Sequence, residues 1–513
     1  MISVGNASLN AARRSRELDW LGTTGAVDVL VVGGGVTGAG VALDAAARGL
    51  SVALVEKHDL AFGTSRWSSK LVHGGLRYLV SGHVGIAYES AVERGILMKT
   101  TAPHLVHPVP QVAPWLPQAT FAQAAMLRSA FLGGDILRTF ARTSDNCLPH
   151  SRRVSSAEIL RYAPTIRPEG LRGGCLTWDG QLYDDARLVV AIARTAAQYG
   201  ARILTRVAAT EVTGRGAVLV DQLTGDRLQV DAGTVINAAG IWADQVASCI
   251  KLRPSRGTHL VLPQSVFGGL SAVLTVPVPG ELRRVVMAIP GPDGRVYVGP
   301  TDEEAPGPVS DVPQASEAEI DFLLDTISSA VHEPLTRADL IGTYSGLRPL
   351  LDTGHHKGED KSADISRRHA VITSPDGVVT IVGGKLTTYR RMAQDALDTA
   401  LEQSSLDVRR PCLTHRIPLV GAADRIRLAA VRAPARFVQR YGVEAPQVIA
   451  GPPELLEPIA PGLLTTYAEL RFAVRHEGAL TEDDVLDRRT RIGLSPMDRE
   501  LAGPAVREAF AAV

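Results

Sequence analysis

At 513 residues the chain is too long for one hydrophobic core, so we expect two or three domains. Lys and Arg together number 54, as do Asp and Glu, and the formal net charge is therefore zero. This balance argues against nucleic acid as the main partner, because nucleic-acid binding needs a basic excess. It still allows a local basic pocket for a small anion.

The first residues and the cysteines exclude further classes of protein. The first 20 residues lack the apolar core of a secretory signal, and we expect residues 1–26 to form a flexible leader. Aspartates and glycines interrupt the one membrane-like stretch, residues 27–47, so the ~20 apolar residues of a spanning helix are missing. The cysteines have no metal-ligand spacing, and we expect reduced, buried thiols and no metal site: Cys147, Cys175, Cys249 and Cys412.

The first predicted elements form a βαβ unit. Residues 27–32 are a short apolar run that predicts a buried strand, and a helical pattern follows Gly38 and stops at Gly49. Residues 51–56 predict a second strand, which ends on Glu56. Strand, Gly-rich turn, helix and strand in this order indicate a parallel sheet.

The Gly-rich turn carries a GxGxxG motif in the context that dinucleotide binding needs. Gly33 permits a tight turn, Gly35 lets the backbone approach a pyrophosphate, and Gly38 lets the helix pack on the strand. The helix N-terminus supplies N–H donors and a positive dipole for phosphate oxygens. Glu56, about 20 residues downstream, is placed to accept hydrogen bonds from ribose hydroxyls.

Two further features favour FAD over NAD. A long polar, Gly-rich loop, residues 62–78, follows Glu56 and can run along an extended cofactor. Gly383 and Gly384 open a predicted helix far down the chain, and its N-terminus can stabilise negative charge on a reduced flavin.

The alternation of strands and helices continues along the chain, and after about residue 405 the pattern is almost wholly helical. Residues 81–175 are helical and Pro-rich, whereas residues 255–350 alternate like strands. The individual predictions are a helix over 184–200, strands over 201–212, 231–240 and 378–384, and a helix from Leu386 to about Gln403.

The expected fold class is α/β, with a Rossmann-like FAD-binding domain, a mixed α+β substrate domain and a helical C-terminal domain. The FAD-binding domain is expected to be discontinuous. We assign it residues 27–80, 176–254 and 366–404, the substrate domain residues 81–175 and 255–365, and the helical domain residues 405–513.

Several strings resemble the FAD-dependent (aerobic type) glycerol-3-phosphate dehydrogenase family, within the D-amino-acid-oxidase-like flavoproteins. They are VVGGGVTGAGVALDAAARGLSVALVE, TSRWSSKLVHGGLRYL, YDDARLV, INAAGIWAD, TYSGLRPL, GGKLTTYRRMA and ELRFAVRHEGALTEDDVLDRRTRIG. The resemblance covers about residues 27–495, and SSKLVHGGLRY and SGLRPL are much more specific than GxGxxG. The leader and the Ser-Arg-Trp at residues 65–67 depart from the family's usual pattern.

The resemblance implies noncovalently held FAD, glycerol 3-phosphate as donor, dihydroxyacetone phosphate as product and a membrane quinone as acceptor. Hydride would pass from C2 of the substrate to flavin N5. Motif and resemblance together predict these cofactor contacts: Gly33, Gly35, Val36, Thr37, Gly38, Glu56, Lys57, Thr64, Ser65, Ser69, Leu71, His73, Gly74, Val207, Ala239, Gly240, Gly384, Lys385, Leu386 and Thr387.

The reaction needs ligands for the substrate phosphate. The resemblance assigns Arg348 to the substrate, and a guanidinium is suited to this role because it grips phosphate oxygens bidentately. We expect Arg348 to lie in an irregular segment before a proline. The resemblance also places Arg77 and Tyr78 in the phosphate pocket. Arg367 is a weaker match, which can shift to Arg368.

The reaction also needs a base and a group that stabilises the developing ketone or alkoxide. Lys385, at the predicted helix start beside the flavin, is assigned to the second role. His73 and His259 compete for the first, because a neutral imidazole is suited to take a hydroxyl proton. The resemblance places His73 near the reacting carbon and favours it, and His259 would then position substrate or flavin.

A basic cluster near the C-terminus allows two interpretations. It could form a second anion site, but ion pairs on a helix surface with Glu482, Asp483 and Asp484 are the favoured interpretation. The cluster consists of His476, Arg488, Arg489 and Arg491.

Residues 114–142 interleave aromatic and apolar side chains with arginines, as in a helix that lies on a bilayer. A helix packed on the substrate domain would show the same pattern, and the resemblance to a peripheral membrane family slightly favours the first interpretation. We therefore expect a cytoplasmic enzyme with peripheral contact at the cytoplasmic face of the cell membrane. We also expect a homo-oligomer.

Three alternative functions use the same sequence features. A glycerol-3-phosphate oxidase, which reduces oxygen to hydrogen peroxide, would share the binding residues, although family oxidases carry an insertion that is not seen in this sequence. An amino-acid oxidase would need a carboxylate clamp instead of a phosphate pocket. A non-catalytic flavin protein would not need the basic residues beside the cofactor. The dehydrogenase is the favoured interpretation.

Overall fold

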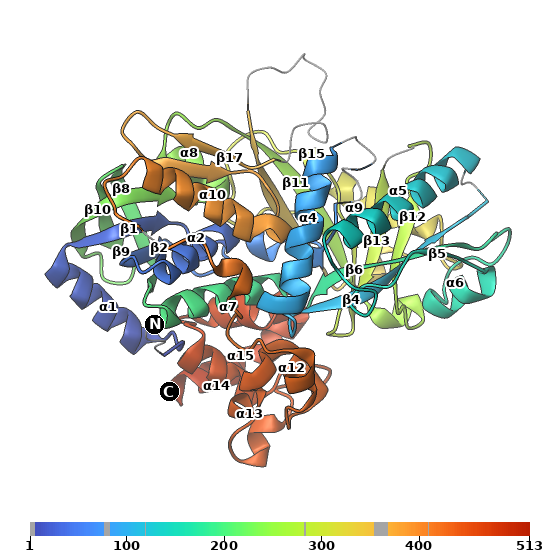
Figure 1. Ribbon diagram of the computed structural model, residues 1–513. Helices are drawn as coiled ribbons and strands as arrows, with labels where there is room; N and C mark the ends of the chain where they lie inside the picture. Colours follow the sequence, from blue (N-terminus) through green and yellow to red (C-terminus); the bar gives the residue numbers. More distant parts are fainter. Residues whose placement is uncertain are drawn as a thin grey trace.

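The computed structural model describes residues 6–75, 79, 83–117, 120–281, 284–352, 368–408 and 410–512. Two sheets lie side by side, and the C-terminal helices pack beneath them (Figure 1). The predicted fold class is confirmed.

The first sheet has eight strands and contains the predicted βαβ unit. Its main path runs β17-β18-β10-β1-β2-β7, and the pairs among β18, β10, β1, β2 and β7 are parallel. Off this path, β9 pairs with β10 and β8 pairs with β9. The strands are β1 (Ala26–Val32), β2 (Val52–Glu56), β7 (Arg202–Thr205), β8 (Val207–Thr213), β9 (Gly216–Asp221), β10 (Arg227–Asn237), β17 (Ala370–Thr373) and β18 (Val379–Val382).

Helices cover both faces of this sheet. Val29 and Val31 of β1 lie in one apolar core with α2 (Val36–Ala47), α7 (Asp185–Gln198) and α10 (Tyr389–Glu402). The helix predicted over 184–200 is confirmed as α7, which begins where the Asp184 carboxylate accepts hydrogen bonds from two backbone N–H groups. The strand predicted over 201–212 is divided into β7 and β8 at Arg206, whose φ is 57°.

The expectation of a flexible leader needs correction. Residues 11–24 form helix α1 (Ala11–Thr24), which Asn10 caps at its N-terminus and which ends at Gly25 with φ 68°. Leu21 is fully buried and packs with Leu30 and other residues on the second face of the first sheet. A polar helix with one buried leucine has little apolar periodicity, and the hydrophobic pattern of the sequence therefore does not predict this helix.

The second sheet has ten strands, in the order β15-β11-β14-β13-β12-β4-β6-β3, with β16 paired to β11 and β5 paired to β6. Residues 176–182, which the sequence placed in the FAD-binding domain, belong to β6 of this sheet. The strands are β3 (Leu71–Val72), β4 (Val106–Pro114), β5 (Arg152–Val154), β6 (Gly174–Leu182), β11 (Leu252–Pro263), β12 (Val273–Pro277), β13 (Val285–Pro290), β14 (Arg295–Gly299), β15 (Glu303–Glu304) and β16 (Gly342–Leu351).

The two faces of the second sheet have different partners. Helices α6 (Ser156–Tyr162) and α9 (Glu317–Ser328) share an apolar core with one face. Tyr297 and Tyr344 lie on the other face and pack with Trp67 and Leu71, which follow the dinucleotide motif in the chain. Helices α4 (Val84–Ile96) and α5 (Phe121–Phe140) lie in front of the two sheets as Figure 1 is drawn. The junction between the sheets therefore lies beside the predicted cofactor.

The C-terminal part is helical, as predicted, and has two apolar cores of its own. It comprises α11 (Arg425–Ala429), α12 (Ala435–Tyr441), α13 (Ala445–Val448), α14 (Tyr467–His476), the π-helical turn η11 (Asp484–Arg489) and α15 (Pro496–Ala511). All four cysteines are free thiols, but Cys249 is exposed and Cys412 is half-buried, contrary to the expectation that all are buried. Within the described ranges, every helix is too short or too polar to cross a bilayer.

Candidate active site

The turn between β1 and α2 has the geometry that the GxGxxG motif predicts. Gly33 has φ 111°, and a Cβ added there would lie 2.6 Å from the Ala238 carbonyl oxygen at the end of β10. A Cβ on Gly38 would lie 1.9 Å from the Gly33 carbonyl oxygen. Both positions therefore require glycine. The strand and helix pack closely without side chains at these positions, so the backbone at the start of α2 stays open to an anion. These features fit the pyrophosphate of a dinucleotide.

Glu56 lies at the end of β2 against this turn. Its Oε2 accepts a hydrogen bond of 2.7 Å from the Gly34 N–H, and its Oε1 accepts one of 2.8 Å from the His58 N–H. Burial raises the pKa of the Glu56 carboxyl, although these backbone donors lower it. The carboxylate lies where a dinucleotide ribose is expected, and its contact with that ribose stays a prediction.

The segment after Glu56 returns to the start of α2. We call residues 57–67 the cofactor loop. Ala61 N–H donates to the Gly34 carbonyl oxygen at 3.0 Å, and Ser65 Oγ accepts from the Val36 N–H at 3.0 Å. Thr64 Oγ1 donates to the Leu347 carbonyl oxygen of β16 at 2.6 Å. The cofactor loop therefore connects the dinucleotide turn to the second sheet.

The second predicted cofactor element lies after β18. Gly383 and Gly384 have φ values of 77° and 72°, and a Cβ on Gly384 would lie 2.4 Å from Met392 Sδ. Lys385 then begins a 3-10 turn, η7 (Leu386–Thr388), which leads into α10. The predicted helix therefore starts as a 3-10 turn and becomes α-helical at Tyr389.

His259 of β11 lies at the junction of the cofactor loop region and the second sheet. Its Nε2 is 2.8 Å from Ser69 Oγ, and its ring stacks on Tyr344 with 4.7 Å between centroids. The side chain is 2% exposed, and among the described residues Nδ1 has no hydrogen-bond partner. Burial lowers the pKa of His259 well below its usual value, and the charges of Lys70 and Arg348 lower it further. The ring is therefore neutral at physiological pH.

A buried lysine next to this histidine was not predicted. Lys70 Nζ lies 2.6 Å from the Asp185 carboxylate, donates to the Arg66 carbonyl oxygen at 2.7 Å and lies 4.7 Å from the Tyr344 ring centroid. Burial lowers the pKa of Lys70, and Asp185 opposes this effect. Both residues fall within strings that carried the family resemblance, and this was the only signal in the sequence.

Arg348 lies on β16 rather than in the irregular segment that the sequence predicted, because β16 continues through Pro349 as the antiparallel partner of β11. Its Nη1 donates to Ser255 Oγ and to Asp302 Oδ1, each at 3.1 Å, and its Nη2 donates to the Thr301 carbonyl oxygen at 3.0 Å. The guanidinium lies over Gly257, where an added Cβ would be 2.3 Å from Nη2. These contacts hold the Arg348 side chain in one orientation.

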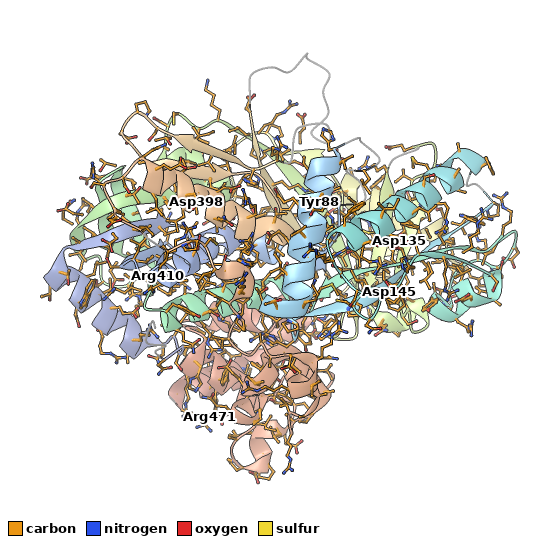
Figure 2. All side chains as sticks on the ribbon, viewed as in Figure 1. Tyr88, Asp135, Asp145, Asp398, Arg410 and Arg471 are labelled. Carbon is orange, nitrogen blue, oxygen red and sulfur yellow. The ribbon has the colours of Figure 1, made fainter. Side chains whose placement is uncertain are left out.

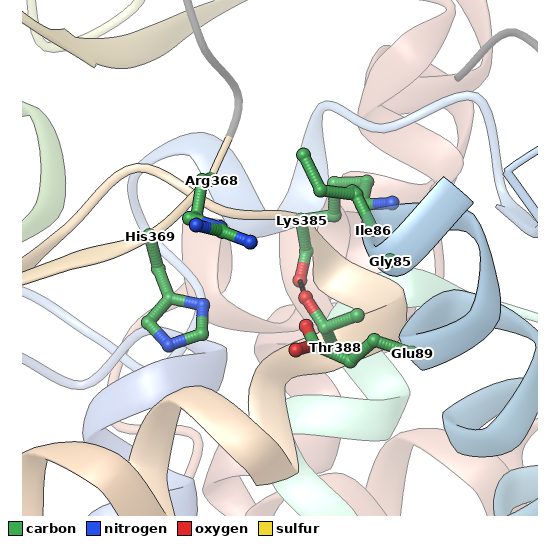
Figure 3. A pocket seen from close by; sticks show the side chains of 7 residues that line it. All are labelled: Gly85, Ile86, Glu89, Arg368, His369, Lys385 and Thr388. Atoms are coloured by element: carbon green, nitrogen blue, oxygen red, sulfur yellow. Dashed lines mark hydrogen bonds between the residues drawn. The ribbon is translucent and has the colours of Figure 1, made fainter. Parts of the chain in front are cut away.

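Lys385 lines a cavity of about 110 Å³ together with Gly85, Ile86, Glu89, Arg368, His369 and Thr388. Figure 3 shows Arg368 and His369 on one side of it and helix α4, with Glu89, on the other. Lys385 Nζ is hydrogen-bonded to Ser90 Oγ of α4, and His369 Nε2 lies 2.9 Å from Asp395 Oδ2. Among the described residues, three basic side chains and one carboxylate line the cavity. Arg368, the shifted alternative to Arg367, is one of them.

The remaining predicted site residues are only partly described. His73 follows β3 and is half-buried, and its Nδ1 lies 3.2 Å from the Gly75 backbone nitrogen. Arg77, Tyr78 and Arg367 lie outside the described residues.

The structure groups the other predicted cofactor contacts in several places. Gly33, Gly35, Val36, Thr37, Gly38, Glu56, Ser65 and Ala239 lie around the first turn, followed closely by Gly240. Thr64, Ser69, Leu71 and Gly74 lie on or just after the cofactor loop, and Gly384, Leu386 and Thr387 lie at the second turn. Val207 is buried in the core of the first sheet, whereas Lys57 is exposed.

The C-terminal arginines correct another expectation. Arg488, Arg489 and Arg491 are buried, not on a helix surface. Arg488 pairs with Asp484 at 2.6 Å, as the favoured interpretation predicted. Arg488 and Arg489 also form ion pairs with Asp59 of the cofactor loop, and Arg491 lies 3.3 Å from the Asp184 carboxylate. In the sequence, a run of charged residues is typical of a solvent-exposed surface. The structure is needed to show that carboxylates of another domain pair with these arginines.

Comparisons with known proteins agree with this geometry. Residues 28–390 match the family model described as FAD dependent oxidoreductase, and residues 412–512 match the C-terminal domain of alpha-glycerophosphate oxidase. The chain is 54% identical over 513 residues to glycerol-3-phosphate dehydrogenase 1 of Mycobacterium tuberculosis, covering 99% of both chains. It is 37% identical to glycerol-3-phosphate dehydrogenase 2 of the same organism, covering 95% of this chain and 84% of that one.

Among solved structures, the chain is similar to the glycerol-3-phosphate dehydrogenase of Bacillus halodurans complexed with FAD. The TM-score is 0.74 at 27% identity, and the match covers 98% of this chain and 94% of that one. The fold, the two glycine turns and the full-length identity together establish that the chain belongs to the FAD-dependent glycerol-3-phosphate dehydrogenase family, within the D-amino-acid-oxidase-like flavoproteins.

Proposed function

We propose that this flavoenzyme oxidises sn-glycerol 3-phosphate to dihydroxyacetone phosphate and passes the electrons to a membrane quinone. FAD supplies the hydride acceptor at flavin N5. The observation that carries the proposal is the full-length identity of 54% to a glycerol-3-phosphate dehydrogenase. Contacts between the cofactor-binding segments and the elements around them support it. Ser69 contacts His259, Thr64 contacts the Leu347 carbonyl oxygen next to Arg348, and Lys385 contacts Ser90 of α4.

Arg348 and the basic cavity are suited to an anionic substrate. Three contacts fix the Arg348 guanidinium before substrate binds, so little conformational entropy is lost on binding. Lys385 and Arg368 lie around one small cavity and would attract a phosphate dianion. Arg77, Tyr78 and Arg367 stay predicted members of this phosphate site, and Lys385 stays the predicted stabiliser of the developing ketone.

The proton of the substrate hydroxyl needs an acceptor. We assign it to His73, which follows the cofactor loop and is half-buried. His259 is enclosed between Ser69 and Tyr344 and is kept neutral by burial, which suits a residue that positions its neighbours.

The exposed face of α4 and α5 is the proposed site of membrane contact. Helix α5 packs Phe131 against Ala113 and Cys175 of the second sheet, as one interpretation predicted, and Leu137 against α4. It also exposes Phe121 (89%) and Phe140 (69%), and α4 adds Val84 and Tyr88, which is labelled in Figure 2. Exposed aromatic side chains on adjacent helices are typical of an interfacial contact. The cytoplasmic location and the homo-oligomer stay predictions.

Turnover with glycerol 3-phosphate and a soluble quinone analogue tests the reaction. We expect dihydroxyacetone phosphate as product and reduction of the quinone, with little oxygen consumed. Stoichiometric oxygen uptake and hydrogen peroxide release, with no quinone reduction, would instead establish the oxidase. That alternative stays open because the C-terminal match is to a domain named after alpha-glycerophosphate oxidase.

A further inference from the structure

The cofactor loop is bonded to the C-terminal domain by buried charges. Asp59 lies three residues after Glu56 and is 1% exposed. Arg489 Nη1 and Nη2 donate to its two carboxylate oxygens at 2.8 and 2.9 Å, and Arg488 Nε donates to Oδ2 at 2.6 Å. Both arginines belong to the π-helical turn η11 and are at most 3% exposed. One carboxylate of the cofactor loop therefore bridges two arginines of another domain.

Other contacts extend this junction along the loop. Arg66 Nη1 donates to Asp487 Oδ2 of η11 at 3.4 Å. The guanidinium carbons of Arg66 and Arg488 lie 5.1 and 5.6 Å from the Phe62 ring centroid. The loop is thus attached to η11 at Asp59, Phe62 and Arg66, which lie on both sides of Ala61 and next to Ser65.

The same short segment makes the contacts that shape the dinucleotide turn. Ala61 N–H donates to the Gly34 carbonyl oxygen, and Ser65 Oγ accepts from the Val36 N–H, the first residue of α2. A displacement of the loop would therefore move groups at the point where the pyrophosphate is expected.

The ionic junction is a strong constraint on the loop. Burial alone would raise the pKa of Asp59, but Arg489 and Arg488 lower it to about 2, so the carboxylate is charged at every physiological pH. A buried charge is costly unless its partners are present. If the loop left η11, Asp59 and Arg489 would lose their ion pair, whereas Arg488 would keep its pair with Asp484.

We propose that Asp59, Arg488 and Arg489 are positioning residues that hold the cofactor loop in its FAD-binding conformation. Through them the C-terminal helical domain determines how tightly FAD is retained. The inference rests on the cofactor of the family and does not depend on the substrate.

The test compares two full-length variants that each neutralise one buried carboxylate between two arginines. Asp59→Asn breaks the junction with the cofactor loop. Glu469→Gln is the matched control, because Glu469 is 1% exposed and pairs with Arg436 and Arg440 inside the C-terminal domain. For each variant, the FAD dissociation constant of the apoprotein is measured by flavin fluorescence, and the thermal unfolding temperature is measured by circular dichroism.

We expect Asp59→Asn to raise the FAD dissociation constant on the order of tenfold or more, because the released loop no longer shapes the turn. Glu469→Gln should change the FAD dissociation constant by no more than about twofold, even if it lowers the unfolding temperature as much as Asp59→Asn does. Equal FAD affinities in the two variants at similar unfolding temperatures would overturn the proposal.

If Asp59→Asn does not fold, Asp487→Asn takes its place. Asp487 is partly exposed and contacts Arg66, Arg488 and Arg499 at 3.2 to 3.6 Å at the edge of the junction, so its loss is milder than that of Asp59. We expect FAD to bind about threefold more weakly with little change in unfolding temperature. An unchanged FAD affinity in this variant would overturn the proposal. Because no substrate is added, either result is independent of the proposed reaction.

Discussion

Ser69 Oγ and His259 Nε2 lie 2.8 Å apart, and this hydrogen bond joins the segment after the cofactor loop to strand β11 of the second sheet. His259 in turn stacks on Tyr344, whose hydroxyl donates to the Ser68 carbonyl oxygen at 2.9 Å. Two strands of the substrate sheet are therefore bonded to consecutive residues on the cofactor side. This junction fixes the distance between the flavin site and Arg348, four residues after Tyr344 on β16.

Replacement of Arg348 by alanine is expected to weaken substrate capture. The substrate phosphate would lose a charge-assisted ligand, which should cost about 2 to 4 kcal/mol of transition-state binding free energy. The corresponding decrease in kcat/KM for glycerol 3-phosphate should come mostly from a higher KM. Arg253→Ala is the control, since Arg253 lies on the paired strand β11 and forms an exposed ion pair with Glu304. Steady-state kinetics would contradict the assignment if both variants kept the wild-type kcat/KM.

Replacement of Gly38 by alanine is expected to abolish FAD binding. The new Cβ would lie 1.9 Å from the Gly33 carbonyl oxygen, so β1 and α2 cannot keep their close packing. Gly22→Ala is a suitable control in helix α1, because the nearest atom to its new Cβ is 3.8 Å away. The flavin content of the purified proteins is the measurement. A Gly38→Ala protein that retains stoichiometric FAD would show that this turn is not the cofactor site.

Replacement of Asp185 by asparagine is expected to destabilise the protein by about 3 to 5 kcal/mol, because it leaves the buried charge of Lys70 without its carboxylate. Glu317→Gln breaks an ion pair with Arg337 in which both side chains are exposed, and should cost at most about 1 kcal/mol. Urea unfolding distinguishes the two. If both variants lost a similarly small free energy of unfolding, the buried charge of Lys70 would not need Asp185 for its stabilisation.

Stability should fall on mild acidification because of buried neutral histidines. Burial, together with His107 and Arg187, lowers the pKa of His104 to about 3. The unfolded chain then binds a proton below about pH 6.5 that the folded protein does not, so this stabilisation is complete above that pH and declines below it. Between about pH 6.5 and 4.5, His104 should contribute a loss of about 2 kcal/mol.

A His104→Gln variant should be less stable at neutral pH but should show a smaller decline on acidification. Thermal unfolding measured across this pH range is the readout, with His150→Gln as the control, because the His150 side chain is largely exposed. An identical pH dependence in wild type and His104→Gln would exclude His104 as the source.

Removal of the exposed aromatic side chains of α5 should weaken membrane binding. The double variant Phe121→Ser, Phe140→Ser removes two side chains that are 89% and 69% exposed, without touching the buried face of the helix. Ile426→Ser, at an 85% exposed position of the C-terminal domain, is the control. Co-sedimentation with liposomes that contain anionic lipid should fall for the double variant alone. Equal sedimentation of the wild type, the double variant and Ile426→Ser would show that α5 is not the membrane-contact site.

Local patterns in the sequence predicted the cofactor half of the molecule well. The run over 27–32, the glycines and Glu56 lie close together in sequence, and their periodicity and spacing determine one βαβ unit. Arg348 was assigned to the substrate by resemblance, but its strand was not predicted, because Gly346 and Pro349 interrupt the alternation.

Long-range charge pairing could not be predicted. Asp59 and Arg489 are 430 positions apart, and neither has a local pattern that indicates a buried partner. The same holds for Lys70 and Asp185, which come from a loop and from the start of α7. Such pairs depend on how domains pack, and a single sequence carries no periodicity for that packing.

Anaerobic mixing of the FAD-loaded protein with glycerol 3-phosphate is the most direct test of the proposed reaction. We expect rapid bleaching of the visible flavin absorption by glycerol 3-phosphate, and none by glycerol or by D-amino acids. An FAD-loaded protein that stays oxidised with glycerol 3-phosphate would contradict the proposed reaction and leave only the flavoprotein fold.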